Sequence, residues 1–104
     1  MALRLKLRPA ARSDAYAAQD WYDDAAPGLG EAFTDELLGV LAFLAANPSV
    51  GSRRYAHFLP DESLRVWPLS RFPFLVFYRV SSKVLDIVRI LHERRDIIAS
   101  LIAH

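Results

Sequence analysis

The chain begins with a period-two pattern, in which leucine alternates with arginine or lysine through residues 3–8. This alternation predicts a β-strand with one apolar and one basic side. Pro9 ends the strand and suits the first turn of a helix, where its missing N–H costs nothing. We therefore expect a short first strand followed at once by a helix.

Two segments then repeat apolar residues at helical spacing. The first predicted helix runs to about Ala25 or Ala26, and the proline–glycine pair at residues 27–28 breaks it. The second carries an apolar stripe through residues 29–44 and stops at the asparagine–proline pair 47–48. The short break predicts an antiparallel hairpin, with its acids toward solvent and its apolar stripe toward a sheet.

The second half of the chain holds aromatic and β-branched runs at residues 64–69, 72–80 and 84–91. Tight connections separate them, which predicts an antiparallel meander. A long connector, residues 49–62, precedes the meander and is predicted to be an ordered surface loop. After the last strand, Asp96 is positioned to cap a short terminal helix whose isoleucines and leucine share one face.

The predicted order is β-αα-βββ-α, an α+β fold in which a helical hairpin packs on one face of a small, mainly antiparallel twisted sheet. At this length residues 1–104 are expected to form a single domain. The sequence contains no cysteine, and neither a metal site nor a cofactor is predicted. No window resembles a signal peptide or a membrane span, so we expect a soluble cytoplasmic protein.

Charge divides the chain into an acidic and a basic part. Residues 13–47 hold seven acids and no lysine or arginine, whereas residues 49–104 hold nine basic residues against five acids. Arginines punctuate the predicted meander, which is consistent either with a solvated sheet face or with a surface for an anionic partner. Strand alternation places Arg65 with Trp67, and Arg79 with two apolar residues of its own strand, which predicts a mixed cationic and aromatic surface.

The element order and several motifs resemble the ParE/RelE superfamily of toxins from type II toxin–antitoxin modules, and the ParE (plasmid stabilisation) branch most. The resemblance spans nearly the whole chain. Its motifs are Arg8-Pro9-Ala10-Ala11, Trp21-Tyr22, Asn47-Pro48, Leu64-Arg65-Val66, Arg71-Phe72-Pro73-Phe74, Val76-Phe77-Tyr78-Arg79-Val80, Ile90-Leu91-His92 and Arg94-Arg95-Asp96.

This resemblance implies a toxin that a cognate antitoxin neutralises in a hetero-oligomer, the antitoxin being of the ParD-like, ribbon-helix-helix class. ParE-type toxins act on DNA gyrase, whereas RelE-type toxins cut messenger RNA on the ribosome. The RelE set of catalytic residues is incomplete here, since Leu75 stands where a central arginine is expected and no tyrosine follows His92. We therefore predict a gyrase inhibitor that works by binding and not an enzyme. The alternatives are a metal-independent endoribonuclease acting on the ribosome and a degenerate, non-toxic member.

Three sets of residues follow as expectations. The predicted target-binding surface comprises Arg65, Trp67, Arg71, Arg79, His92, Arg94 and Arg95. In the ribonuclease alternative the catalytic residues are Arg65, Arg71 and His92. The groove between hairpin and sheet is the predicted antitoxin site, with Trp21, Tyr22, Phe33 and Leu37 as its contacts.

Overall fold

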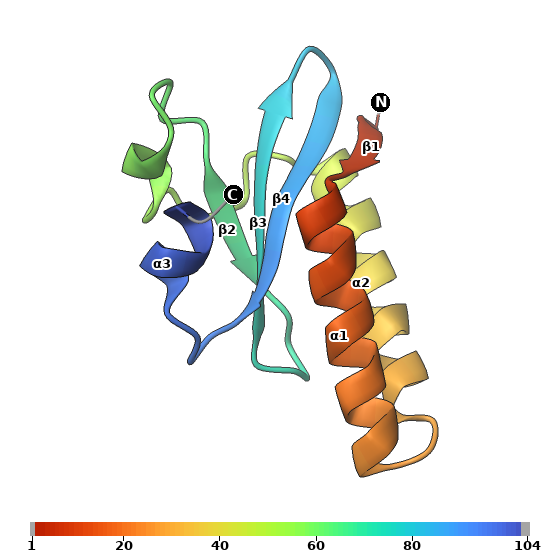
Figure 1. Cartoon of the computed structure of the whole chain (residues 1–104). Helices are drawn as coiled ribbons and strands as arrows, with labels where there is room; N and C mark the ends of the chain where they lie inside the picture. The colour runs from red at the N-terminus through yellow and green to blue at the C-terminus, as the bar shows by residue number, and fades with distance from the viewer. Residues whose placement is uncertain (1, 103–104) are drawn as a thin grey trace.

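The structure, a computed structural model, describes residues 2–102 as an α+β fold in the predicted β-αα-βββ-α order. Its strands and helices are seen in Figure 1. They are β1 (Arg4–Leu7), α1 (Pro9–Ala25), α2 (Leu29–Ala46), β2 (Arg65–Pro68), β3 (Phe74–Ser81), β4 (Val84–His92) and α3 (Ile97–Ile102), with a short 3₁₀ turn at Ala56–Phe58 in the connector. None of the described helices is long and apolar enough to cross a membrane.

Within residues 2–102 the strands form one sheet in the order β1-β4-β3-β2. Strands β2, β3 and β4 are antiparallel neighbours, as the meander predicted, while β1 pairs in parallel with the first half of β4. The β3–β4 register skips Val88, so Phe77 pairs with Arg89 and Tyr78 with Ile87. Such a bulge increases the local twist of the two strands.

The α1–α2 hairpin covers one face of the sheet (Figure 1). Gly28 bridges the two helices at φ 85°, a left-handed conformation that glycine adopts without strain. Gly30 lets them approach closely, because an added Cβ would lie 2.5 Å from the Gln19 carbonyl oxygen. Its N–H donates to Asp23 Oδ1 at 2.9 Å. The predicted helical hairpin is therefore confirmed, and the structure adds the close approach at Gly30 and its contact with Asp23.

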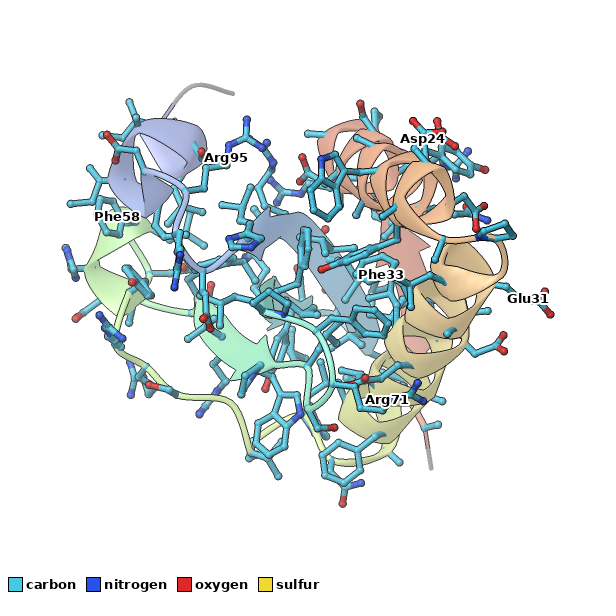
Figure 2. All side chains as sticks on the ribbon, turned by 90° about the horizontal axis from the view of Figure 1, so that it is seen from below. Asp24, Glu31, Phe33, Phe58, Arg71 and Arg95 are labelled. Atoms are coloured by element: carbon cyan, nitrogen blue, oxygen red, sulfur yellow. The ribbon has the colours of Figure 1, made fainter. Side chains whose placement is uncertain are left out.

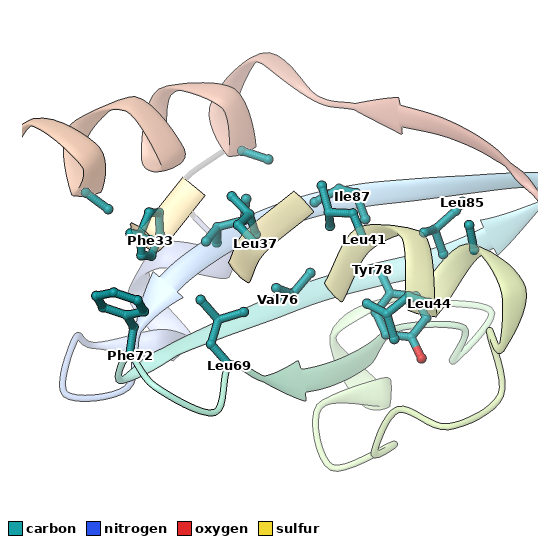
Figure 3. Close-up of a cluster of buried hydrophobic side chains, with 14 of the residues drawn as sticks. Phe33, Leu37, Leu41, Leu44, Leu69, Phe72, Val76, Tyr78, Leu85 and Ile87 are labelled. Atoms are coloured by element: carbon teal, nitrogen blue, oxygen red, sulfur yellow. The ribbon is translucent and has the colours of Figure 1, made fainter. Parts of the chain in front are cut away.

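The main core lies between this hairpin and the sheet. Figure 3 shows the apolar stripe of α2, from Phe33 to Leu44, facing side chains of β3 and β4. Rings of Tyr22, Phe72 and Phe74 pack around Phe33 at the far end of the helices. Removing this much apolar surface from water is the dominant force that holds helices and sheet together.

The other sheet face is also partly covered. Leu64, Phe77 and Leu91 form a second core cluster there with Ile97 and Leu101 of α3. The connector adds aromatic side chains to this cluster. Asp96 caps α3 as predicted, accepting the Ala99 N–H at 3.1 Å.

The expected apolar face of the terminal helix is divided between the core and the surface. Ile97 and Leu101 are buried against the sheet, whereas Ile98 and Ile102 are exposed. The short helix therefore closes the second core with half of its apolar side chains.

Several acids of the hairpin are not simply solvated, which corrects the sequence-based expectation. Asp14 pairs with Arg89 of β4, and Asp23 caps the N–H of Gly30. Glu36 accepts the backbone N–H of Arg71 at 3.0 Å. These carboxylates tie the helices to one another and to the sheet, so helical spacing alone misplaced them.

Replacing Tyr78 with phenylalanine should lower the free energy of unfolding by about 1–3 kcal/mol, because it leaves buried groups unpaired. The Tyr78 hydroxyl accepts the Gly51 N–H at 2.9 Å and donates to the Pro48 carbonyl at 2.8 Å. It thereby fixes the start of the connector against β3. Chemical denaturation followed by tryptophan fluorescence measures the loss, and Tyr16→Phe on the exposed surface of α1 is the matched control.

The stability difference between the parent protein and Tyr78→Phe should also depend on pH. Burial raises the pKa of Tyr78 above its ordinary value. Because the pKa of Tyr78 is higher in the folded than in the unfolded protein, its hydroxyl contributes fully to stability below a pH of about 10, the pKa of tyrosine in the unfolded chain. This contribution is lost as the pH rises toward the folded value, so the difference between the parent and Tyr78→Phe should shrink above that pH. A difference that stays constant across this range would contradict the assignment.

Candidate functional site

A groove opens beside α1 where β1 stops. Strand β1 ends at Leu7, paired with Ile87, because Pro9 begins the helix. Strand β4 continues to His92, and no strand of the described residues pairs with it on that side beyond Ile87. The space between α1 and this half of β4 is a groove of 680 Å³. Its α1 wall carries small side chains, among them Ala10 and Ala17, which leave it open.

Trp21 and Tyr22 form the apolar end of the groove. Their rings meet edge to face with centroids 5.2 Å apart. Tyr22 is buried and belongs to the core, whereas Trp21 is 67% exposed. Such exposure makes Trp21 a candidate contact for a partner protein, since indole rings are enriched at protein interfaces.

An ion pair forms the polar floor of the groove. Arg89 donates from Nε and Nη2 to the two carboxylate oxygens of Asp14 at 2.7 and 2.9 Å. Its Nη1 donates to the Ser100 carbonyl of α3 at 2.8 Å. Asp14 also accepts the Ile90 N–H, in place of the strand that is missing there. The hydrogen bond to Asp14 raises the pKa of Arg89, so this guanidinium stays charged.

His92 stands at the end of β4 with its ring in the groove. Its Nδ1 accepts the Arg94 backbone N–H at 3.0 Å, so the neutral ring carries its proton on Nε2. The ring also packs edge to face on Phe74, with centroids 5.2 Å apart. Backbone and aromatic contacts therefore set the orientation of this imidazole.

Arg94 and Arg95 form the turn after β4, and both are exposed. Their backbone N–H groups bond to His92, one to Nδ1 and one to the carbonyl oxygen. Figure 2 shows Arg95 between α3 and α1, and it lines the groove together with Trp21. Two of the predicted antitoxin contacts, Trp21 and Tyr22, therefore lie in the same groove as His92 and Arg95 of the predicted target surface.

The other predicted cations lie elsewhere. Arg65 and Trp67 share a side of β2 as predicted, but it is the side toward α2. There Arg65 donates to the carbonyls of Ser49 and Gly51, while the Trp67 ring packs on Phe43 at 5.5 Å. Through these contacts the side chains of Arg65 and Trp67 hold the loop after α2 and the end of α2 against β2.

Arg79 is on the opposite face of the sheet from Arg65. It pairs with Asp61 at 3.1 Å and with Asp86 at 3.6 Å, and it donates to the Ser63 hydroxyl. Its strand neighbour Phe77 is buried under the connector and α3. The mixed cationic and aromatic surface that strand alternation predicted is therefore split between two faces.

Arg71 lies in the loop between β2 and β3. Figure 2 shows it beside α2, away from Arg95. Its backbone N–H is held by Glu36, and its guanidinium lies 5.8 Å from the Phe72 ring centroid. The three side chains of the ribonuclease alternative, Arg65, Arg71 and His92, thus contact different parts of the molecule.

The predicted antitoxin contacts also separate. Trp21 and Tyr22 line the groove. Phe33 and Leu37 belong to the core and are 0% and 4% exposed, so they offer no surface to a partner. Their helical spacing marks a buried stripe, and the sequence does not show what covers it.

Sequence reasoning missed two ion pairs, the buried Asp14–Arg89 pair and the half-buried Arg8–Asp86 pair. Arg8 donates to both oxygens of Asp86 at 3.0 and 2.8 Å, and this hydrogen bonding raises the pKa of Arg8. One signal was available. Asp86 and Arg89 are charged residues within an apolar strand, and a charge buried in a sheet requires a partner. Among residues 2–102 there is no cluster of three side chains suited to hold a metal ion.

Comparisons with known proteins agree with this architecture. The family model described as the ParE toxin of the type II toxin–antitoxin system parDE matches residues 5–97. A solved structure of the chromosomal ParDE toxin–antitoxin system from P. aeruginosa is similar, with a TM-score of 0.74 and 26% sequence identity. The match covers 88% of this chain and 96% of that chain. The search of curated proteins gave no significant match.

Proposed function

Because this chain belongs to the ParE toxin family of type II toxin–antitoxin systems, we propose that it inhibits DNA gyrase in the cytoplasm and that a cognate antitoxin neutralises it. Residues 1–104 act as one toxin domain in this proposal. The observation that carries it is the groove beside α1, which gathers Trp21, His92 and Arg95 on one accessible surface of a ParE-type fold.

The toxin acts by binding. Acid–base catalysis of RNA cleavage needs positioned groups close to one phosphate. Arg65 donates to backbone carbonyls at the end of α2, and Arg71 stands beside Glu36, so neither joins His92 in the groove. The exposed Arg95, which lines the groove, and the exposed Arg94 beside it in the same turn suit instead an anionic surface of the target.

In this proposal the antitoxin neutralises the toxin by covering its target-binding surface. The apolar end of the groove, at Trp21 and Tyr22, gives an antitoxin its anchor. A segment seated there also covers His92 and Arg95, which line the same groove. A ParD-like, ribbon-helix-helix antitoxin in a hetero-oligomer would thereby remove the proposed target contacts from solution.

Supercoiling of relaxed plasmid by purified gyrase, with this protein titrated in, tests the proposal. Loss of supercoiling with accumulation of cleaved DNA is the expected result. Unimpaired supercoiling by folded protein would overturn the gyrase assignment. Cleavage of ribosome-bound messages would then identify a ribonuclease, and harmless overexpression without antitoxin would identify a non-toxic member.

Trp21→Ala should weaken antitoxin binding by about 2 kcal/mol or more, roughly a thirtyfold rise in Kd, as for an interface hot spot. The exposed ring contributes little to folding, so the free energy of unfolding should change by less than about 0.5 kcal/mol. Titration calorimetry with the antitoxin encoded beside the toxin gene measures Kd. Leu38→Ala is the control, since Leu38 is comparably exposed on α2 and outside the groove. Equal affinities of the two variants would place the antitoxin elsewhere.

A further inference from the structure

A second cationic surface lies away from the groove, on the sheet face opposite the hairpin. Strand β1 is one of the two edge strands, and its Arg4 and Lys6 pair in register with Val84 and Asp86 of β4. Residues that pair in register point to the same side of a sheet. Arg79 of β3 pairs with Asp86 as well, so it belongs to the same side. We call this surface the basic face, and it consists of Arg4, Lys6, Arg8, Arg79 and Lys83.

Lys83 joins the basic face at the β3–β4 turn. The Arg4 N–H donates to the Lys83 carbonyl at 3.1 Å, which places the turn beside the start of β1 (Figure 1). Ser82 and Lys83 have φ of 49° and 66°. Two-residue hairpin turns with positive φ at both positions favour asparagine and glycine. A lysine at this position is therefore unfavourable for the backbone.

The cations of the basic face are arranged in two tiers. Arg8 and Arg79 are half-buried and flank the Asp86 carboxylate, at 2.8 and 3.6 Å. Arg4, Lys6 and Lys83 are exposed and form no ion pair in the part of the chain that the structure describes. With Asp61 and Asp86 as the only carboxylates in these pairs, the face retains an excess of about three positive charges.

The chemistry of this face fits phosphates of duplex DNA. Alternate side chains of a strand repeat at about 6.6 Å, so Arg4 and Lys6 form a row of charges along the sheet edge. Phe77, the aromatic residue of β3 on the same face as Arg79, is fully buried, so it offers no exposed ring on which single-stranded bases could stack. The row from Arg4 to Arg8 spans only about 13 Å, too short for the two minor grooves that duplex RNA-binding domains contact.

We propose that the basic face binds the phosphate backbone of duplex DNA without sequence preference. Arg4, Lys6 and Lys83 displace the counterions. Arg8 and Arg79 line a hollow of 260 Å³ beside them, together with Asp61 and two apolar residues of the connector. This inference goes beyond gyrase inhibition, because it concerns another face of the molecule and requires neither gyrase nor antitoxin.

The test is fluorescence anisotropy of a short labelled DNA duplex of random sequence, titrated with the toxin over a range of salt concentrations. About three phosphate contacts predict a slope of log K against log salt of roughly −3. Arg4→Ala and Lys6→Ala should each reduce the magnitude of this slope by about 0.9. Arg53→Ala and Arg54→Ala, in the connector at the opposite edge of the sheet, should leave it unchanged.

The variant Lys83→Gly distinguishes an effect on DNA binding from an effect on folding stability. Glycine relieves the positive φ, so this variant should unfold at a higher denaturant concentration than the parent. It should nevertheless bind DNA more weakly, with the slope again reduced by about 0.9. A salt-independent signal, an equal loss in the Arg53→Ala and Arg54→Ala controls, or tighter binding to duplex RNA or to polyglutamate than to duplex DNA would overturn the proposal.

Discussion

Replacing Arg89 with alanine should lower the free energy of unfolding by about 3–5 kcal/mol, since it leaves a buried carboxylate without its counterion. The side chains of Arg89 and Asp14 are only 10% and 7% exposed. The guanidinium also holds the Ser100 carbonyl, so its loss releases α3 as well as α1 from β4. This cost is a large part of the roughly 5–15 kcal/mol that stabilises a domain of this size.

Urea denaturation measures the effect, and a double-mutant cycle identifies its source. Asp14→Ala should cost a similar amount, and the double variant should cost less than the sum of the two, because it leaves neither charge unpaired. Arg12→Ala, an exposed cation of α1, is the matched control. If Arg89→Ala unfolds the protein, Arg89→Lys retains the charge and keeps the test measurable. Additive single effects would show that the two side chains do not stabilise the fold as a pair.

The second large effect concerns the proposed target surface. Arg94→Glu with Arg95→Glu should reduce inhibition of gyrase supercoiling by about a hundredfold, because repulsion replaces attraction at an anionic target. Both side chains are exposed, and only their backbone N–H groups bond to His92. The turn and the His92 ring should therefore keep their geometry, and thermal unfolding should occur at the parent temperature.

The control is the double variant Arg53→Glu with Arg54→Glu, which makes the same change of charge on a different surface. It should inhibit gyrase supercoiling as strongly as the parent protein does. Equal loss in both double variants would point to net charge and not to the groove. Undiminished inhibition by the Arg94/Arg95 variant would remove this turn from the target surface. In that case Arg71, exposed on the loop before β3, is the next residue to reverse.

Much of the fold was predictable because it depends on short-range patterns. Alternation in β1, the apolar stripe of α2 and the breaks at Gly28 and Pro48 each act within a few residues. The cap of α3 by Asp96 is equally local. These signals fix the elements and their order, and the family resemblance fixed how they are assembled.

The functional surface was less predictable, since a residue type does not reveal its partner. Arg65 and Arg95 look alike in the sequence, yet the first is held by carbonyls of the preceding loop and the second lines an open groove. Arg79 alternates with apolar neighbours as expected, but the connector and α3 cover those neighbours. Partners that are tens of residues away decide which arginines remain available for binding.

Local patterns in the chain were enough to specify the β-αα-βββ-α order, the basic side of the first strand and the apolar stripe that became the core. The packing of the elements, in contrast, sets the end of β1 opposite Ile87, so that a groove opens between α1 and β4. It also brings Asp14 and Arg89 together across 75 residues of chain. Periodicity reflects the geometry of one element, whereas a groove and a buried ion pair depend on how separate elements meet.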